Sequence, residues 1–126
     1  MKKIIQTSAS PAPIGPYSQA VIAGNMLFVS GQIAINPATN ELINGEIQDE
    51  AAQVMENLKQ ILSEAGYGFE HVVKTSIFLS DMKHFAEVNE IYGSYFHSDF
   101  PARETVAVAG LPKNVNVEIS VIAYKS

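Results

Sequence analysis

A stripe of apolar residues between Ile47 and Ala65 constrains the fold of this chain more than any other feature. Its members recur at spacings of three and four residues: Ile47, Ala51, Val54, Met55, Leu58, Ile61, Leu62 and Ala65. This spacing predicts an amphipathic helix that buries one face. Gly66 follows the stripe, where a helix commonly ends in a left-handed residue. Because such a helix must cover an apolar surface, the rest of the chain has to supply one.

Segments with strand character flank this helix on both sides. Gly24-Asn25, between two apolar runs, is a hairpin signal, whereas residues 36–40 and Asn44-Gly45 are typical of loops. A second helix should follow a cap at Ser80 or Asp81. The strands are predicted over 17–23, 26–33, 71–79, 103–109 and 115–124, with 3–6 as a short further candidate. The second helix carries an aromatic-rich face: Phe85, Val88, Tyr92, Tyr95 and Phe96.

This order of elements predicts a single α+β domain over residues 1–126, a sheet with both helices on one face. The last strand has two unlike faces. One is apolar: Val115, Val117, Ile119, Val121 and Ala123. The other is mixed: Asn116, Glu118, Ser120, Ile122 and Tyr124. A mixed face suits a binding site or a contact between subunits.

Composition narrows the classes of function. A formal net charge of −5 argues against nucleic-acid binding driven by phosphate contacts. With no cysteine, disulfides and thiolate chemistry are excluded. His71, His84 and His97 lack a metal-ligand spacing, so we expect no metal site. No apolar run is long enough to span a membrane or to act as a signal peptide, and we expect a cytoplasmic protein. Only 17% of the residues are charged, which favours self-association.

Arg103 is the first candidate for a ligand-binding residue. Strand alternation places it on one face with Thr105, Ala107 and Ala109, whose small side chains leave room beside it. A guanidinium group binds a carboxylate through two parallel hydrogen bonds. Alternatively, Arg103 is a surface residue that forms a salt bridge with Asp99 or Glu104.

Four other positions could contribute to a site. Glu118, among apolar neighbours, could act as an acid or base with a raised pKa, or be a solvated strand residue. Tyr17 follows a stiff Gly15-Pro16 turn and could close over a ligand, or pack at an edge. The Ser30-Gly31 backbone could approach a ligand, or form a bulge. Asn89 could be a polar group of a pocket, or an exposed helix residue.

Several short motifs, in order along the whole chain, resemble those of the RidA family, also called the YjgF or reactive-intermediate deaminase family. They are Ile14-Gly15-Pro16-Tyr17, Val29-Ser30-Gly31-Gln32, Glu56-Asn57-Leu58-Lys59, Val73-Lys74-Thr75, Phe100-Pro101-Ala102-Arg103, Leu111-Pro112-Lys113 and Val117-Glu118-Ile119. The resemblance implies a chorismate-mutase-like α+β fold and a homotrimer with sites in clefts between subunits. It also implies cofactor-free hydrolysis of 2-imino or 2-amino-2-alkenoic acids, such as 2-iminopropanoate and 2-iminobutanoate, to 2-oxo acids and ammonia.

The resemblance also implies roles for individual residues. Arg103 would hold the substrate carboxylate and Glu118 would position or activate water. Tyr17, Asn89 and the Ser30-Gly31 backbone would line the pocket. Thr105 occupies a position where many bacterial members carry cysteine, so a thiol nucleophile is not required. Ser120 stands where many members have a second glutamate, which could change the efficiency of Glu118.

Two other functions remain open at this point. The same cleft could bind or sense a small carboxylate, such as a 2-oxo acid, without turnover. Some family members are also described as ribonucleases or translation inhibitors, and the acidic composition weighs against that reading.

Overall fold

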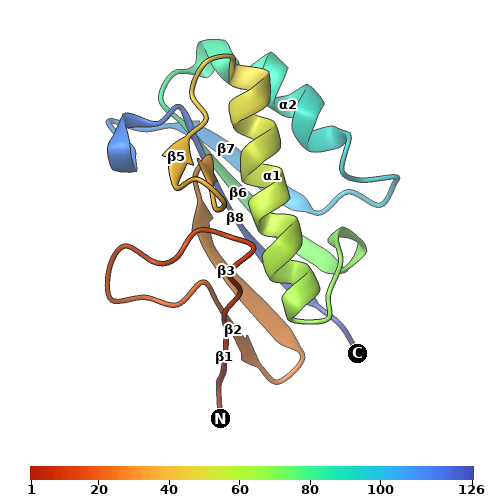
Figure 1. Cartoon of the computed structure of the whole chain (residues 1–126). Coiled ribbons are helices and arrows are strands. Elements are labelled where there is room, and N and C mark those ends of the chain that lie inside the picture. Colours follow the sequence, from red (N-terminus) through yellow and green to blue (C-terminus); the bar gives the residue numbers. More distant parts are fainter.

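A six-stranded sheet carries two helices on one of its faces, as the computed structural model of residues 1–126 shows (Figure 1). The helices are α1 (Ile47–Glu64) and α2 (Phe85–Gly93). The strands of the sheet, in spatial order, are β1 (Lys3–Ile5), β2 (Ala20–Ala23), β3 (Met26–Gln32), β8 (Val117–Tyr124), β6 (Val72–Leu79) and β7 (Ala102–Ala107). A small separate hairpin pairs β4 (Ile35–Asn36) with β5 (Glu41–Leu42). The predicted α+β architecture is confirmed.

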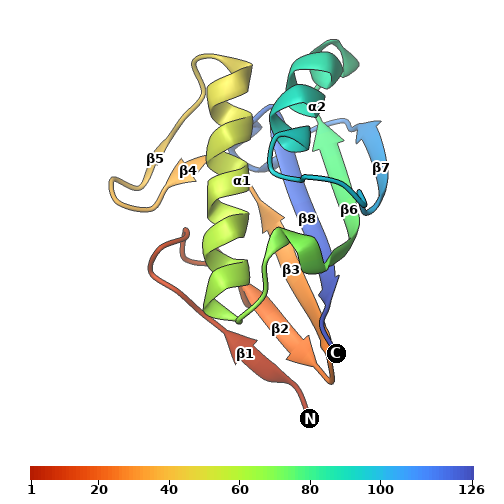
Figure 2. The same ribbon diagram turned by 90° about the vertical axis from the view of Figure 1, so that its right-hand side faces the viewer.

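The sheet is mixed because of the connection between β6 and β7. These two strands pair in parallel, whereas every other neighbouring pair is antiparallel. A parallel pair needs a crossover, and α2 lies in that crossover (Figure 2). In the strand order, β7 lies at one edge of the sheet, and β6 separates it from β8.

Helix α1 follows the predicted stripe closely. Val54, Leu58 and Ile61 are fully buried against the sheet. The helix ends one residue before the predicted boundary, with Ala65 as its cap. Gly66 then adopts a φ of +82°, the left-handed conformation that its position predicted.

Helix α2 is shorter than its aromatic pattern predicted. It ends at Gly93, so Tyr95 and Phe96 lie beyond it and pack around Phe69. Of the two candidate caps, Asp81 is the one used: its side chain accepts a hydrogen bond from the backbone of Lys83 in the short 3₁₀ turn before the helix. Of the predicted apolar face, Val88 and Tyr92 are buried, Tyr95 and Phe96 are partly buried in the loop after the helix, and Phe85 is exposed.

The two faces of the sheet differ as the last strand predicted. Val117, Ile119 and Val121 are buried beneath the helices. No element of the chain covers the opposite face, which we call the open face. Its residues, fixed by strand register, include Phe28, Phe78, Val106, Glu118, Ser120, Ile122 and Tyr124. Phe28, Val106 and Tyr124 are between 42% and 45% exposed, which makes this face an apolar surface open to solvent.

The start of one predicted strand shifts near the N-terminus. The predicted strand at 17–23 begins only at Ala20, because the preceding residues form an irregular loop. We call residues 7–18, which project from the sheet between β1 and β2, the Tyr17 arm (Figure 1). The short strand predicted near Lys3 is present as β1.

No helix combines the length and apolar character needed to cross a membrane.

Candidate functional site: an arginine recess and a separate glutamate group

Arg103 lies on β7, on the face of the sheet that the helices cover. Its register partner on β6 is Thr75, which is fully buried. The guanidinium carbon lies 5.1 Å from the centre of the Tyr92 ring and 5.8 Å from that of Phe85. Both rings come from α2, so cation–π contacts hold the arginine against the helix.

No carboxylate of this chain neutralises Arg103. The ion pairs within 4.0 Å join Lys74 to Glu104 and His71 to Glu70. Glu104 points to the other face, where Ser76 donates a hydrogen bond to it and Lys74 lies 3.0 Å away. These two contacts, the Ser76 bond first, lower the pKa of Glu104. The alternative of a surface salt bridge from Arg103 to Asp99 or Glu104 is therefore wrong.

Other polar groups surround the arginine. Thr105 lies on the same face of β7, and its hydroxyl oxygen is buried without a hydrogen-bond partner. Asn89 is an exposed residue of α2, as one of its two interpretations predicted, yet it also lines the same hollow as Arg103. This hollow, the arginine recess, has a volume of about 310 Å³. Its lining comprises Asn89, Tyr92, Gly93, Phe100, Pro101 and Arg103.

Glu118 lies on β8, on the open face of the sheet. Burial raises the pKa of its carboxyl group because partial desolvation penalises the charged form. Gly31 faces it from a bulge in β3, where the register shifts between Val29 and Gln32. A Cβ atom at Gly31 would lie 2.3 Å from Oε2 of Glu118, so only glycine leaves room for the carboxylate.

Tyr17 and Ser30 adjoin Gly31, the residue that faces this carboxylate. Tyr17 and Gly31 both line a small hollow beneath the Tyr17 arm. The hydroxyl of Tyr17 accepts a hydrogen bond of 3.3 Å from the backbone N–H of Ile14. The hydroxyl of Ser30 donates to the backbone oxygen of Ser18, at the end of the arm. We call Tyr17, Ser30, Gly31 and Glu118 the glutamate group.

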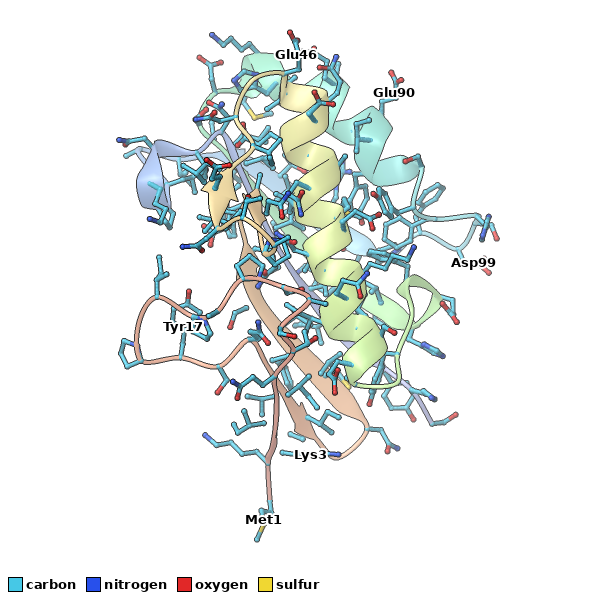
Figure 3. All side chains as sticks on the ribbon, in the orientation of Figure 1. Met1, Lys3, Tyr17, Glu46, Glu90 and Asp99 are labelled. Atoms are coloured by element: carbon cyan, nitrogen blue, oxygen red, sulfur yellow. The ribbon has the colours of Figure 1, made fainter.

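The arginine recess and the glutamate group do not meet within one chain. On β6, Thr75 pairs with both Arg103 and Val121, so Arg103 shares the helix-covered face. Phe78 pairs with both Glu118 and Val106, so Glu118 lies on the open face. Tyr17 and Asp99, four residues before Arg103, project from opposite sides of the molecule (Figure 3). A site that uses both Arg103 and Glu118 is therefore incomplete within one chain.

Sequence reasoning missed the residues that hold the arginine. Tyr92 lies on the aromatic-rich face predicted for the second helix, and it is buried, but one ring face also carries the guanidinium. Its hydroxyl donates a 3.0 Å hydrogen bond to Thr75, which fixes the ring. Burial raises the pKa of this hydroxyl, so it stays protonated. No sequence pattern links Tyr92 to a strand ten residues later.

The structure contains no cluster of three or more His, Asp or Glu side chains that could hold a metal ion. The chain carries an unpaired cation and an unpaired hydroxyl on one face of the sheet, and a partly buried carboxylate on the other. The first two groups can bind an anion, and the carboxylate can move a proton.

Comparison with known proteins assigns the chain to a family. Residues 7–125 match the sequence profile of the family described as endoribonuclease L-PSP. The chain belongs to this family, the RidA/YjgF family. The resemblance drawn from the short motifs is thereby confirmed.

Three relatives show that the similarity to this chain covers almost its whole length. A RutC family protein of Pyrococcus horikoshii is 52% identical over 125 residues, covering 99% of both chains. The human 2-iminobutanoate/2-iminopropanoate deaminase is 44% identical, covering 99% of this chain and 91% of its own. The crystal structure of E. coli TdcF with bound serine superposes with a TM-score of 0.94 at 42% identity, covering 98% and 99% of the two chains.

Proposed function

We propose that this member of the RidA/YjgF family hydrolyses 2-imino acids, such as 2-iminobutanoate and 2-iminopropanoate, to 2-oxo acids and ammonia. The observation that carries the proposal is the unpaired guanidinium of Arg103. It is held by Tyr92 and Phe85, has no carboxylate partner, and lies on the same strand face as the unpaired hydroxyl of Thr105.

An arginine held in this way suits the carboxylate of a small acid. Its planar donors can form two parallel hydrogen bonds with the two carboxylate oxygens. Because the aromatic rings restrict the guanidinium before the ligand arrives, less freedom is lost on binding. The recess of about 310 Å³ also lies at the small end of the range of ligand pockets.

Glu118 is proposed to transfer protons during the reaction. The oxygen of a water molecule bonds to the carbon of the protonated imine while Glu118 accepts a proton from that water. The carbon–nitrogen bond then breaks. Both protons of the water end on the nitrogen, which leaves as ammonium, and the oxygen remains as the 2-oxo group. A raised pKa suits a carboxylate that must both accept and return a proton near neutral pH.

Since Arg103 and Glu118 lie on opposite faces of one sheet, the proposed site needs two copies of the chain. The arginine recess of one copy would face the glutamate group of another. The apolar open face, with Phe28, Val106 and Tyr124 exposed, supports such self-association. We propose a homotrimer with three such sites, the assembly that the family resemblance implies.

The relatives support the same substrate class. Proteins from human, cattle and a mite that carry the name 2-iminobutanoate/2-iminopropanoate deaminase are 44–48% identical to this chain. The TdcF structure contains serine, a small molecule with a carboxylate beside a nitrogen-bearing carbon. An imino acid presents the same two groups.

A coupled assay tests the proposal. An amino-acid oxidase generates 2-iminobutanoate, and the release of 2-oxobutanoate is followed with and without the protein. We expect acceleration by the wild type, and a loss of about 10²-fold or more in Arg103→Lys, because an ammonium group cannot form the paired hydrogen bonds. Lys113→Ala, which removes an exposed cation elsewhere, serves as the control. No acceleration by the wild type, or equal acceleration by Arg103→Lys, would sink the assignment.

Ligand binding can be tested separately, since Arg103 is the only arginine in the chain. Butanedione, which modifies arginine, should add a single group per chain. We expect 2-oxobutanoate to slow this modification, as seen by mass spectrometry. An unchanged rate at saturating 2-oxobutanoate would contradict a carboxylate site at Arg103.

A second candidate function is the binding or sensing of a small carboxylate without turnover. It is favoured by the separation of Arg103 and Glu118, because within one chain the anion-binding recess lies on one face of the sheet and the proton-transfer carboxylate on the other. The two functions differ in what Glu118→Ala does. A deaminase loses turnover in this variant, whereas a sensor has no turnover to lose and keeps its affinity for 2-oxobutanoate.

A further inference from the structure

The Tyr17 arm has little regular structure of its own. Between β1 and β2 its residues form no helix or strand. Its internal contacts are short-range: Tyr17 N–H donates to the oxygen of Gly15, and Ala9 N–H to the hydroxyl of Thr7. Something outside the loop must therefore hold it in one conformation.

Gln19 supplies that restraint through its side chain. It is only 2% exposed, directly before β2. Its Oε1 accepts a 2.7 Å hydrogen bond from the backbone N–H of Thr7. Its Nε2 donates to the backbone oxygens of Thr7 at 3.0 Å and Pro11 at 2.8 Å. A longer contact of 3.3 Å reaches the oxygen of Ser10 and shares one of the two amide hydrogens.

These bonds close the arm and leave the amide fully satisfied. The donor and the acceptor of the Gln19 side chain both bind Thr7, twelve residues away, so they join the two ends of the loop. The bonds to Ser10 and Pro11 fix its first half. All four bonds end on backbone atoms of the arm, and none goes to the sheet or to a helix.

The main chain of Gln19 joins the arm to the glutamate group. Its backbone oxygen accepts a 2.9 Å hydrogen bond from the N–H of Ser30, the residue before Gly31. The hydroxyl of Ser30 donates a 2.6 Å hydrogen bond to the backbone oxygen of Ser18, the residue before Gln19. On the opposite side, the hydroxyl of Ser10 donates to the backbone oxygen of Asn57 on α1 at 2.7 Å. The arm is thus held between α1 and the bulge that faces Glu118.

We infer that Gln19 is a positioning residue, which fixes the Tyr17 arm and thereby places Tyr17 beside Gly31, the residue that faces Glu118. Gln19 does not itself contact the proposed substrate. Its effect on binding comes through Tyr17, and this catalytic part of the inference rests on the proposed deaminase function. The structural part, that the Gln19 amide holds the arm, does not.

Amide hydrogen exchange tests the structural part without any assay of activity. Gln19→Glu keeps the size of the side chain and the bond from Thr7 N–H, but it places a carboxylate oxygen against three backbone oxygens. Gln6→Glu makes the same substitution at an exposed residue next to the arm and is the matched control. We expect exchange over residues 7–18 to rise about tenfold or more in Gln19→Glu alone, with α1 and β6 unchanged.

Unchanged exchange in the arm would overturn the inference, as would an equal rise across the whole chain. If the carboxylate prevents folding, Gln19→Met removes all of the side-chain hydrogen bonds, including the one from Thr7 N–H, without adding a charge. The same local rise is expected there, and its absence counts against the inference in the same way.

A double-mutant cycle tests the catalytic part. In the coupled assay, Gln19→Glu should raise KM about tenfold and change kcat less, because a pocket wall is displaced while Glu118 stays in place. In a Tyr17→Ala background the same substitution should change KM less than about twofold. Fully additive effects would show that Gln19 does not act through Tyr17. If the wild type has no deaminase activity, the proposed function fails, while the exchange experiment still decides the role of Gln19.

Discussion

At the scale of single residues, the absence of a side chain at Gly31 matters as much as the presence of Glu118. The carboxylate occupies the space that a Cβ atom would take, with Oε2 at 2.3 Å from that position. The atom displaced by a larger residue is the far end of a flexible side chain, not backbone. A substitution there should therefore move the carboxylate more than it disturbs the fold.

Gly31→Ala is thus expected to separate activity from stability. The new methyl group pushes the Glu118 carboxylate out of place, and we predict a loss of kcat of about 10²-fold or more. The free energy of unfolding, from urea titration, should change by less than about 1 kcal/mol. Gly45→Ala is the control, because a Cβ atom there meets nothing within 4 Å. Full activity in Gly31→Ala would show that the position of this carboxylate is unimportant.

The charge on Glu118 should lower the stability of the folded chain in a way that depends on pH. Burial raises the pKa of its carboxyl group in the folded chain. The charged form is therefore less favourable in the folded chain than in the unfolded one. This penalty is absent below the unfolded pKa of about 4.3 and grows as the pH rises through the folded pKa.

Glu118→Gln removes this penalty along with the charge. At pH 7 we expect the variant to be more stable than the wild type by up to ~1 kcal/mol, because the carboxyl is only partly shielded from water. Near pH 3.5 the two proteins should be equally stable, since both side chains are neutral there. Urea titrations at the two pH values measure this, and a variant less stable at pH 7 would contradict the assigned cause. Its turnover should fall by about 10²–10⁴.

Strand parity made part of this residue-level picture predictable. Alternation correctly grouped Arg103 with Thr105 and separated Glu118 from the buried Val117 and Ile119. The partners of Arg103 could not be predicted in the same way. Tyr92 and Phe85 reach it through a crossover helix, and no local pattern in the sequence records which ring lies over which strand.

At the scale of elements, Glu50 ties the helix layer to the strand that carries Glu118. It is a charged residue of α1 and yet only 1% exposed. Its Oε2 accepts hydrogen bonds from the backbone N–H groups of Asn116 at 2.7 Å and Val117 at 3.1 Å. Its Oε1 accepts one from the Asn116 side chain at 3.0 Å. These bonds fix the start of β8, one residue before Glu118.

We predict that Glu50→Ala lowers the free energy of unfolding by about 2–4 kcal/mol, because buried donors lose their acceptor. Glu50→Gln should lose less, since one amide oxygen can still accept from both backbone groups. Glu64→Ala, at an exposed position of the same helix, should change stability by no more than about 0.5 kcal/mol. Urea unfolding measures all three, and a loss in Glu50→Ala no larger than in Glu64→Ala would contradict the role of these bonds.

The elements themselves were largely predictable where one physical signal dominated. The stripe from Ile47 to Ala65, followed by Gly66, located α1 to within one residue. The β4–β5 hairpin was not predicted, because each strand has only two residues and leaves no periodic pattern. Tyr95 and Phe96 have helical spacing but lie beyond α2. Their rings can pack against Phe69 from a loop as well as from a helix, so the apolar spacing does not show where the helix ends.

At the scale of the whole molecule, the strand order decides where the site can be. Hydrophobic alternation shows which residues of one strand share a face, but not which strands are neighbours. Only the order β3-β8-β6-β7 shows that Arg103 and Glu118 lie on opposite faces of one sheet. The motifs therefore predict a role for both residues, while their separation within one chain could not be predicted from the sequence.

In the proposed deaminase, Arg103 of one copy works with Glu118 of another. Arg103→Ala and Glu118→Ala are each expected to be inactive alone. Unfolding the two variants together in equal amounts and refolding them produces mixed assemblies. In these, some sites combine the intact Arg103 of one variant with the intact Glu118 of the other.

Random mixing should restore about a quarter of the wild-type rate of 2-iminobutanoate hydrolysis, since each intact residue is supplied half of the time. Mass spectrometry of the intact assemblies confirms that both variants are present in one particle. If the mixed assemblies form and remain as inactive as the separate variants, Arg103 and Glu118 do not share a site between copies, and the proposed site is wrong.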